Sequence, residues 1–349
     1  MSSLRGRERA RSRDRSRAMT VSKDLKKRIR DRQAKTGESY TTARTHVLSE
    51  QAEVLAPIAA EPDRYEAVVL RTNRTSTEVR PIGEASDVTF KDVDASSHEP
   101  IVPGHIVTLL FEKRWSRLGR VHASGRIQDV RIDIPRLGLS PLAFDGGEPE
   151  DIREYSEPAR GRDEYSKLWR KLTAKPRPSY EFDELAWGSF PDEHPDDNPT
   201  CLAAELREAG QEAEAIALLM DTLARDLRVL DAHAGLGNIA FDDAPKRALA
   251  HYEVGIRIGE LSLPANFNGL LVWGRLYNRA FLRCLHGYGL SLWRLGDFAG
   301  AEDVFMRILS FNPDDHQGVR FCWIDVRRGR SWQESQGDDI REDRRRILH

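Results

Sequence analysis

Residues 288–313, YGLSLWRLGDFAGAEDVFMRILSFNP, decide the fold of the C-terminal part of the chain. Gly289 and Ala301, 12 positions apart, are small residues that leave room where two helix backbones approach each other. Phe305 adds bulk four residues later, and Pro313, eight residues after that, cannot continue a helix. The spacing therefore predicts a pair of antiparallel helices.

This pattern resembles a tetratricopeptide repeat, in which two helices form a unit that repeats about every 34 residues. In that family the small residues let the helices approach, the bulky residue fills the space between repeats, and the proline ends the second helix. Tyr288 and Ile308 depart from the family, which usually has a leucine and a small residue at these places. Neither departure abolishes the match.

Two further copies are expected upstream. Their anchor residues are Leu236, Gly237, Ala248, Tyr252 and Gly255 in one copy and Leu202, Ala203, Gly210, Ala215 and Leu219 in the other. Ala215 and Ala248 are 33 residues apart, but Ala248 and Ala301 are 53 apart, so residues 261–280 are an insertion. With residues 310–321, this insertion resembles a subgroup of bacterial repeat proteins and implies no particular activity. We expect stacked helix pairs over residues 199–330, beginning at Asn198 and Pro199.

The repeat resemblance implies a concave groove, lined by the first helix of each pair, that accepts an extended peptide or a helix. The residues expected to line it are Asn238, Phe241, His286, Leu290, Trp293 and Arg294. Aromatic rings would supply contact area, and Arg294 or Asn238 would fix a backbone or a carboxylate. Alternatively, the insertion or the C-terminal helix covers Trp293 and Phe241. The clamp by which some family members hold chaperone tails is not recognisable.

Residues 64–145 contain short β-branched runs separated by Asn, Gly, Pro and Asp, which predicts a small antiparallel β-domain, either a barrel or a sandwich. Alternation over residues 130–134, VRIDI, predicts a strand there. A hairpin with the basic and aromatic composition of a single-stranded nucleic-acid site is expected at Lys113, Arg114, Trp115 and Arg117. The alternative is a solvated turn with Trp115 packed into the end of the barrel.

The N-terminal residues are strongly basic. Residues 1–18 are predicted to be a disordered Arg-rich tail, with Met19 as an alternative translation start. Residues 20–50 are predicted to form two basic helices, and they resemble the helix-turn-helix-like segments with a SYTxAR core found in bacterial proteins. In a DNA reader, the side chains facing phosphates or base edges would be Arg28, Arg30, Arg32 and Arg44. Otherwise the helices dock on protein and the arginines are solvated.

Residues 146–198 are predicted to be an acidic, Pro-rich linker. Residues 146–200 hold seven of the chain's 17 prolines and carry 14 acidic against 8 basic side chains. A short helix is expected over residues 163–172, and Trp169, Trp187 and Phe190 indicate that parts of the segment lie on a neighbouring domain. Residues 331–349 are predicted to be a charged C-terminal tail.

The charge is distributed unevenly along the 349 residues. The formal net charge is -2, but residues 1–35 carry 14 Lys or Arg and only 4 Asp or Glu, so the rest of the chain carries -12. Spaced arginines favour contact with polyanions. No apolar run reaches the roughly 20 residues that span a bilayer, and no secretion signal is recognisable, so we expect a cytoplasmic protein without membrane contact.

Sequence motifs for catalysis, cofactors or metals are not found. GLGN at residues 235–238 lies in a predicted helix and follows no strand, which argues against a nucleotide site. His233 and His251 lack metal-ligand spacing, and the three cysteines, Cys201, Cys284 and Cys322, form no CxxC. The first hypothesis is a non-enzymatic cytoplasmic adaptor that binds a protein partner through the groove. The alternative is a regulator that binds DNA or RNA, and a third is an enzyme with its site between the β-domain and the repeats.

Overall fold

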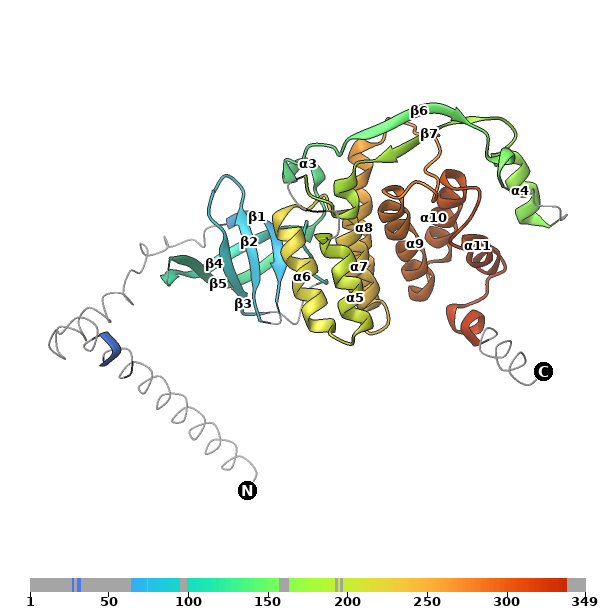
Figure 1. Cartoon of the computed structure of the whole chain (residues 1–349). Helices are drawn as coiled ribbons and strands as arrows, with labels where there is room; N and C mark the ends of the chain where they lie inside the picture. The colour runs from blue at the N-terminus through green and yellow to red at the C-terminus, as the bar shows by residue number, and fades with distance from the viewer. Residues whose placement is uncertain are drawn as a thin grey trace, which may run out of the picture.

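The computed structural model describes residues 27, 30–32, 64–73, 75–94, 99–117, 119–156, 163–191, 194 and 197–337. In these residues a small β-barrel comes first, a two-stranded ribbon follows, and a helical part completes the chain (Figure 1). The predicted order, a small β-domain before an all-helical part, is confirmed. The predicted tail at residues 1–18 and most of the two basic helices at residues 20–50 lie outside the described residues.

Five strands close into a barrel in the order β1-β2-β3-β5-β4. The strands are β1 (Arg64–Thr72), β2 (Thr77–Pro81), β3 (Val88–Asp92), β4 (Ile106–Arg117) and β5 (Arg120–Arg131). The domain is therefore a barrel and not a sandwich. The prediction of wholly antiparallel pairing is wrong for β3 and β5, which are parallel. A tight hairpin fixes β5 antiparallel to β4, and β5 closes the barrel by meeting β3 with its other edge.

Strand alternation fills the barrel interior. The buried side chains are those of Ala67, Val69, Val79, Val88, Phe90, Val107, Leu109, Phe111, Ala123 and Ile127. Only a glycine fits at Gly125, because a Cβ there would lie 1.8 Å from the backbone oxygen of Leu110, beside the register shift in β4. The predicted strand over residues 130–134 is wrong beyond Arg131, because Pro135 occupies the first turn of a short helix, α3 (Ile134–Leu137).

The segment predicted to be a linker is folded. Strand β6 (Phe144–Glu150) pairs antiparallel with β7 (Arg177–Phe182) and lies along the helical part (Figure 1). Three helices accompany this ribbon: η1 (Ile152–Glu154), α4 (Glu164–Leu172) and η2 (Glu184–Trp187). Phe182 and Phe190 are buried in the core of the helical part. The linker prediction is corrected because apolar side chains spaced among the acidic ones give this segment a face to bury.

Within residues 197–337, the helical part has three consecutive helix pairs, then one further helix, and then a helical stretch over residues 332–337. The pairs and the further helix are α5 (Pro199–Glu208), α6 (Glu212–Arg225), α7 (Leu230–Ala240), α8 (Pro245–Gly259), α9 (Asn278–Leu295), α10 (Phe298–Phe311) and α11 (Val319–Arg327), with η4 (Glu260–Ser262) after α8. Helix α5 begins where predicted, because Oδ1 of Asn198 accepts from the backbone N–H of Thr200 at 2.8 Å. Gly296, at φ 91°, ends α9, and Asp297 caps α10.

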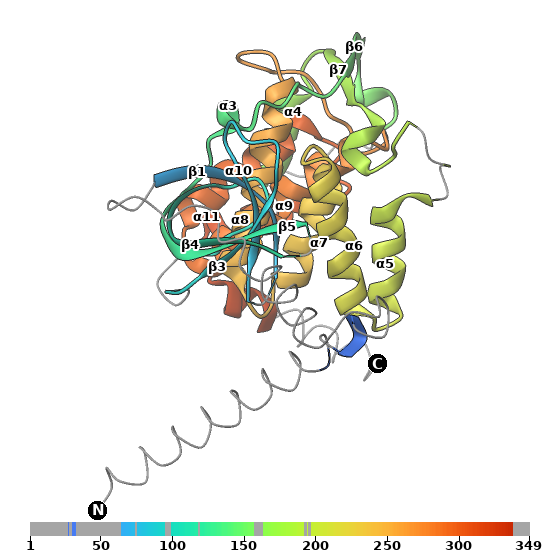
Figure 2. The ribbon, with the colours of Figure 1, turned by 90° about the vertical axis from the view of Figure 1, so that its left-hand side faces the viewer.

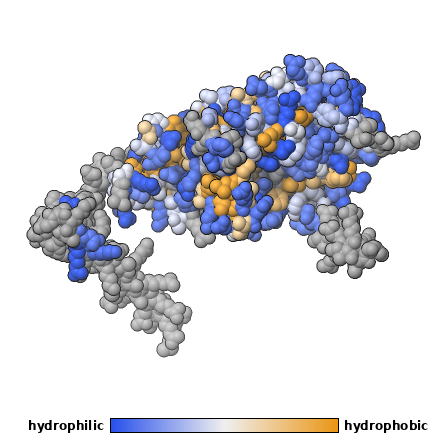
Figure 3. Space-filling view, viewed as in Figure 1, coloured by the Kyte–Doolittle hydropathy of each residue, from blue (hydrophilic) through white to orange (hydrophobic). Residues whose placement is uncertain are grey.

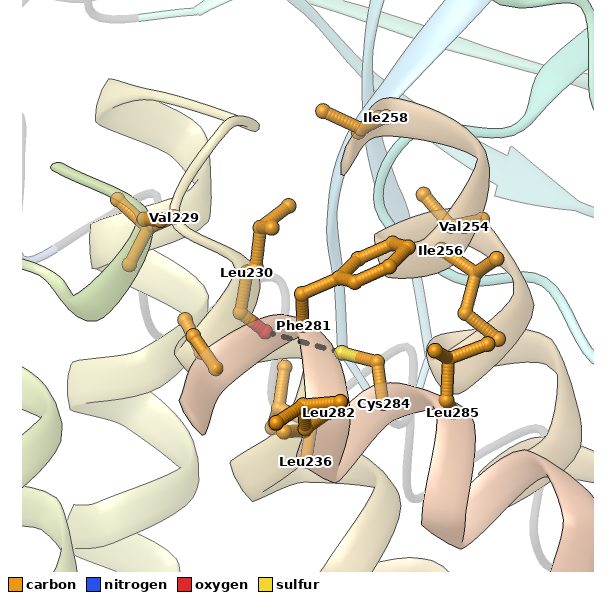
Figure 4. Close-up of a cluster of buried hydrophobic side chains, with 14 of the residues drawn as sticks. Val229, Leu230, Leu236, Val254, Ile256, Ile258, Phe281, Leu282, Cys284 and Leu285 are labelled. Atoms are coloured by element: carbon orange, nitrogen blue, oxygen red, sulfur yellow. Dashed lines mark hydrogen bonds between the residues drawn. The ribbon is translucent and has the colours of Figure 1, made fainter. Parts of the chain in front are cut away.

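Small residues allow close helix packing at the predicted places. A Cβ at Gly289 would lie 2.6 Å from the ring of Phe305, and a Cβ at Gly237 would lie 2.4 Å from the ring of Tyr252. Figure 4 shows the core where α7, α8 and α9 meet, with Cys284 of α9 donating to the backbone oxygen of Leu230 at 3.3 Å. These pairings agree with what the repeat resemblance implies, and the resemblance itself stays a prediction.

The barrel packs directly on the helical part. Figure 2 shows the barrel in front of the helices, and Arg71 of β1 forms an ion pair with Asp221 of α6. The loop before β4 lies close to α8, since a Cβ at Gly104 would be 2.5 Å from Val254. Among the described residues, no helix has both the length and the apolar character needed to cross a bilayer.

Candidate functional site

A cavity of about 410 Å³ opens among α7, α8, α9 and the loop after α10. Its lining residues are Asn238, Phe241, Tyr252, Trp273, Arg283, His286, Gly287, Leu290, His316 and Gln317. Four of the six residues predicted to line a groove lie here: Asn238, Phe241, His286 and Leu290. The lining combines aromatic rings with side chains that can donate hydrogen bonds, and it contains no carboxylate.

Asn238 is exposed and its amide is oriented by Tyr252. The hydroxyl of Tyr252 donates to Oδ1 of Asn238 at 2.7 Å, and the ring of Tyr252 is buried. Burial raises the pKa of Tyr252 above its usual value, so this hydroxyl is a donor at neutral pH. With Oδ1 engaged, the amide Nδ2 of Asn238 is the group available to a ligand carbonyl.

Arg283 lies between a buried carboxylate and an indole ring. Its Nη1 donates to both oxygens of Asp231, at 2.8 and 2.9 Å. Its guanidinium carbon is 5.7 Å from the centre of the Trp273 ring. Burial raises the pKa of Asp231, and the charge and hydrogen bonds of Arg283 oppose that effect. Only Nη1 of Arg283 contacts Asp231, and the other nitrogens of the guanidinium are available to a ligand in the cavity.

His286 and Gln317 meet at the side of the cavity. Nε2 of Gln317 donates to the backbone oxygen of Leu282 at 3.3 Å and lies 3.5 Å from Nδ1 of His286. Nε2 of His286 and Oε1 of Gln317 have no hydrogen-bond partner among the described residues. Burial lowers the pKa of His286 to about 4, so the imidazole is neutral at pH 7.

Six lining residues were not predicted to belong to the site: Tyr252, Trp273, Arg283, Gly287, His316 and Gln317. Trp273 lies in the insertion of residues 261–280 and Gln317 in the turn of residues 310–321, two segments that the sequence distinguishes from an ordinary repeat. The sequence therefore marked both segments as unusual. It did not show which face of the helical part they cover, because tertiary packing decides that.

Trp293 and Arg294 do not line the cavity, contrary to prediction. Trp293 is 2% exposed, its Nε1 donates to the backbone oxygen of Arg330 at 2.8 Å, and its ring packs edge-on against Trp332. Arg294 donates to the backbone oxygen of Phe241 at 2.8 Å and pairs with Asp242. The alternative of cover by the C-terminal helix thus holds for Trp293, and the start of the predicted charged tail, residues 331–337, is folded.

The predicted nucleic-acid residues are only partly described. Trp115 stacks on His122 across β4 and β5, and Lys113 and Arg117 are exposed. Arg114 points elsewhere, because it pairs with Glu84 at 2.7 Å. Arg30 and Arg32 are helical, with Arg30 exposed, whereas Arg28 and Arg44 lie outside the described residues.

A second cavity, of about 740 Å³, lies between the barrel and α8. Its rim consists largely of charged side chains that neutralise one another: Lys246 with Glu99 at 3.6 Å, Arg131 with Asp133 at 3.7 Å and Arg257 with Glu253 at 3.7 Å. Its apolar lining comes mainly from α8 and from the chain after β5, and Pro100, Val130 and Leu295 add to it.

Three buried histidines lie near this boundary: His105, which precedes β4 and lines the cavity, His233 of α7 and His251 of α8. The Nδ1 atom of each lacks a hydrogen-bond partner among the described residues. Burial lowers the pKa of His105 and of His233 to about 4 and the pKa of His251 well below its usual value. All three rings are therefore neutral at pH 7.

The cysteines are free thiols, and Cys284 is buried. In the part of the chain that the structure describes, no cluster of three or more His, Cys, Asp or Glu side chains could hold a metal ion. No family model matches the chain, and no curated protein matches it significantly.

Proposed function

We propose that this chain is a non-enzymatic cytoplasmic adaptor whose helical part binds an extended segment of a protein partner. The observation that supports the proposal is the cavity of about 410 Å³, whose lining is aromatic and rich in hydrogen-bond donors. Aromatic side chains give large contact areas at small entropic cost, which is why they dominate protein interfaces. The residues that carry binding are Asn238, Trp273, Arg283 and Leu290.

The chemistry of the lining suits the carbonyl groups of an extended peptide. Nδ2 of Asn238 is available as a donor because Oδ1 of the same amide is held by Tyr252. The guanidinium of Arg283 adds further donors, and no lining side chain is a carboxylate that would repel a ligand acceptor. Leu290 and Phe241 provide the apolar contact that excludes water from such hydrogen bonds.

The cavity also determines which substitutions test binding. Trp293 and Arg294 support the fold through Arg330 and Asp242, so changing them alters stability as well as any surface. Leu290 is partly exposed and lines the cavity, so a change there alters the binding surface first.

The experiment compares proteins captured from source-cell lysate, after nuclease treatment, by the wild-type full chain, by Leu290→Glu and by Leu202→Glu. Leu202, on α5, is a matched control because it is also an exposed leucine, at 46% exposure, and lies outside the cavity. In Figure 3, apolar side chains gather where α5 and α6 lie. Leu202→Glu therefore also tests whether a partner binds to this second apolar surface.

The proposal requires a partner that the wild type and Leu202→Glu capture and that Leu290→Glu loses. Asn238→Ala should weaken capture of the same partner. A partner lost by Leu202→Glu and kept by Leu290→Glu would place binding on α5 and α6 and refute the cavity. Unchanged capture by all variants would refute it as well.

A further inference from the structure

Trp115 and His122 form a cross-strand aromatic pair on the barrel. They are register partners on β4 and β5, with ring centres 5.7 Å apart and an angle of 13° between the ring planes. Both side chains are partly exposed. Ala123, next to His122, is fully buried, so alternation along β5 directs His122 and its partner Trp115 to the outer surface of the barrel. Two nearly parallel rings thus present flat aromatic surface to the solvent.

Lysines lie beside this pair on the same surface. The register joins Lys113 of β4 to Ser124 of β5 and Ser124 to Lys91 of β3, so the three residues form a row next to Trp115 and His122. Both lysines are exposed, and Nζ of Lys113 lies 5.7 Å from the centre of the Trp115 ring. Acidic side chains border the row: Glu112 precedes Lys113 and pairs with Arg126, and Glu78 of β2 lies opposite Thr89, the β3 partner of His122.

The cations of this surface are not neutralised by neighbours. Lys91, Lys113, Arg117 and Arg120 form no ion pair with any residue that the structure describes. Other arginines of the barrel do form such pairs, including Arg126 with Glu112 at 3.3 Å. The hairpin over residues 113–120 contains no acidic residue, although the chain after residue 35 carries -12. The excess positive charge of the barrel is therefore concentrated beside the aromatic pair.

We propose that this surface, formed by Lys91, Lys113, Trp115, Arg117, Arg120 and His122, binds single-stranded nucleic acid. A base stacks on the Trp115–His122 pair, and the four cations contact the phosphates on either side. The partly exposed rings favour single strands, because their bases are free to stack on protein side chains, whereas the bases of a duplex are already stacked on one another. The unpaired cations add affinity for the phosphates. This binding is separate from the capture of a protein partner by the helical part.

The test uses the full chain and a fluorescent single-stranded oligonucleotide of about 15 nucleotides, a duplex of the same length, and vesicles of anionic phospholipid. Trp115→Ala should weaken single-strand binding about tenfold and leave duplex and vesicle binding unchanged, since base stacking on one aromatic ring contributes about that factor. Trp115→Phe, which keeps a ring in the same place, should restore most of the affinity. Melting temperatures of both variants check that the barrel remains folded.

The salt dependence separates this surface from the basic N-terminal residues. Replacing both Lys91 and Lys113 by Gln should reduce the slope of log affinity against log salt by about 1.4, because each phosphate contact to a single strand contributes about 0.7. Arg126→Gln is the matched control, since Arg126 is exposed and already paired with Glu112, and it should leave the slope unchanged. The N-terminal residues are the same in every protein compared.

The proposal is overturned if Trp115→Ala binds the single strand within twofold of the wild type. It is also overturned if the wild type shows no preference for the single strand over the duplex, or if the substitutions weaken vesicle binding and not oligonucleotide binding. A loss of protein partners in the Leu290→Glu capture experiment would leave this result untouched, so the two proposals succeed or fail separately.

Discussion

The ring of Tyr252 occupies the space that a side chain at Gly287 would need, because a Cβ at Gly287 would lie 2.2 Å from the ring. The ring is fully buried, and Gly237 borders it on the side of α7. Helices α7, α8 and α9 therefore meet at one aromatic side chain, which also orients Asn238 in the cavity.

Gly287→Ala is expected to destabilise the protein by about 3 kcal/mol, at the upper end of the cost of overpacking a close-packed core. Gly274→Ala is the control, because a Cβ at Gly274 meets nothing within 4 Å. Urea unfolding of both variants measures the difference. Equal free energies of unfolding would show that α9 moves away from Tyr252 at little cost.

Trp293→Ala is expected to reduce the free energy of unfolding by about 3–5 kcal/mol, the usual cost of truncating a buried Trp. It should also release residues 331–337, whose Trp332 packs against Trp293. Limited trypsin digestion would then cut faster after Arg327, Arg328 and Arg330.

Trp115→Ala is the control for Trp293→Ala, since Trp115 is partly exposed and lies on the barrel. It should cost less than about 1 kcal/mol, as surface substitutions usually do. If both variants lost similar stability, the packing of residues 331–337 on Trp293 would be unimportant.

Stability is expected to fall as the pH drops from about 6.5 towards 4. The folded chain holds His105 and His233 with a pKa of about 4 and His251 with a pKa well below its usual value. In the unfolded chain these groups titrate near 6.5, so between these pH values the unfolded state binds more protons and is favoured. Above about pH 6.5 the effect vanishes. Below that pH, each histidine lowers the free energy of unfolding by up to about 1.4 kcal/mol per pH unit.

His251→Met tests this pH dependence, because methionine fills similar volume and cannot take up a proton. Its free energy of unfolding, measured in urea at pH 7.5 and at pH 5.0, should change less than that of the wild type. The same change in both proteins would mean that His251 is protonated in the folded chain.

Arg177→Met is expected to cost about 2 kcal/mol, because three backbone carbonyl groups, two of them in partly buried hydrogen bonds, would lose a charged donor. The guanidinium of Arg177 donates to the backbone oxygens of Asn268, Gly269 and Ser310 at 2.8 to 2.9 Å, which joins β7 to the insertion and to α10. Lys175→Met, at an exposed position two residues earlier, is the matched control and should be nearly neutral. Thermal unfolding of the two variants distinguishes these outcomes, and equal melting temperatures would contradict the role of Arg177.

The local signals in the sequence predicted the three helix pairs and the strands of the β-domain. Asn198 and Pro199 specify the start of α5, and Gly296 with Asp297 specifies the turn between α9 and α10, because caps and left-handed glycines act within a few residues. The β-branched runs identified a small β-domain in the same way, but only the structure decided that it is a barrel and not a sandwich. The strand over residues 130–134 failed because the same local pattern was interrupted by Pro135.

The ribbon of β6 and β7 was decided by tertiary structure. Its acidic and Pro-rich composition predicts a linker, yet Phe144 stacks on Tyr180 with ring centres 5.0 Å apart, and Phe182 is buried against the helices. Composition measures the average polarity of a segment, whereas folding depends on whether its few apolar side chains find a surface that buries them.

In the candidate site, too, the sequence predicted some of the residues and the tertiary structure decided the others. The repeat resemblance, taken from the sequence alone, implied that Asn238, His286 and Leu290 lie on first helices of the pairs and face one groove. Only the tertiary structure decided that Trp273 and Gln317 join them and that Trp293 is covered by Trp332. Gln317 lies 31 positions from its neighbour His286, and Trp293 lies 37 and 39 positions from Arg330 and Trp332. Irregular segments separate these residues, so no periodicity connects their side chains and packing alone sets the geometry.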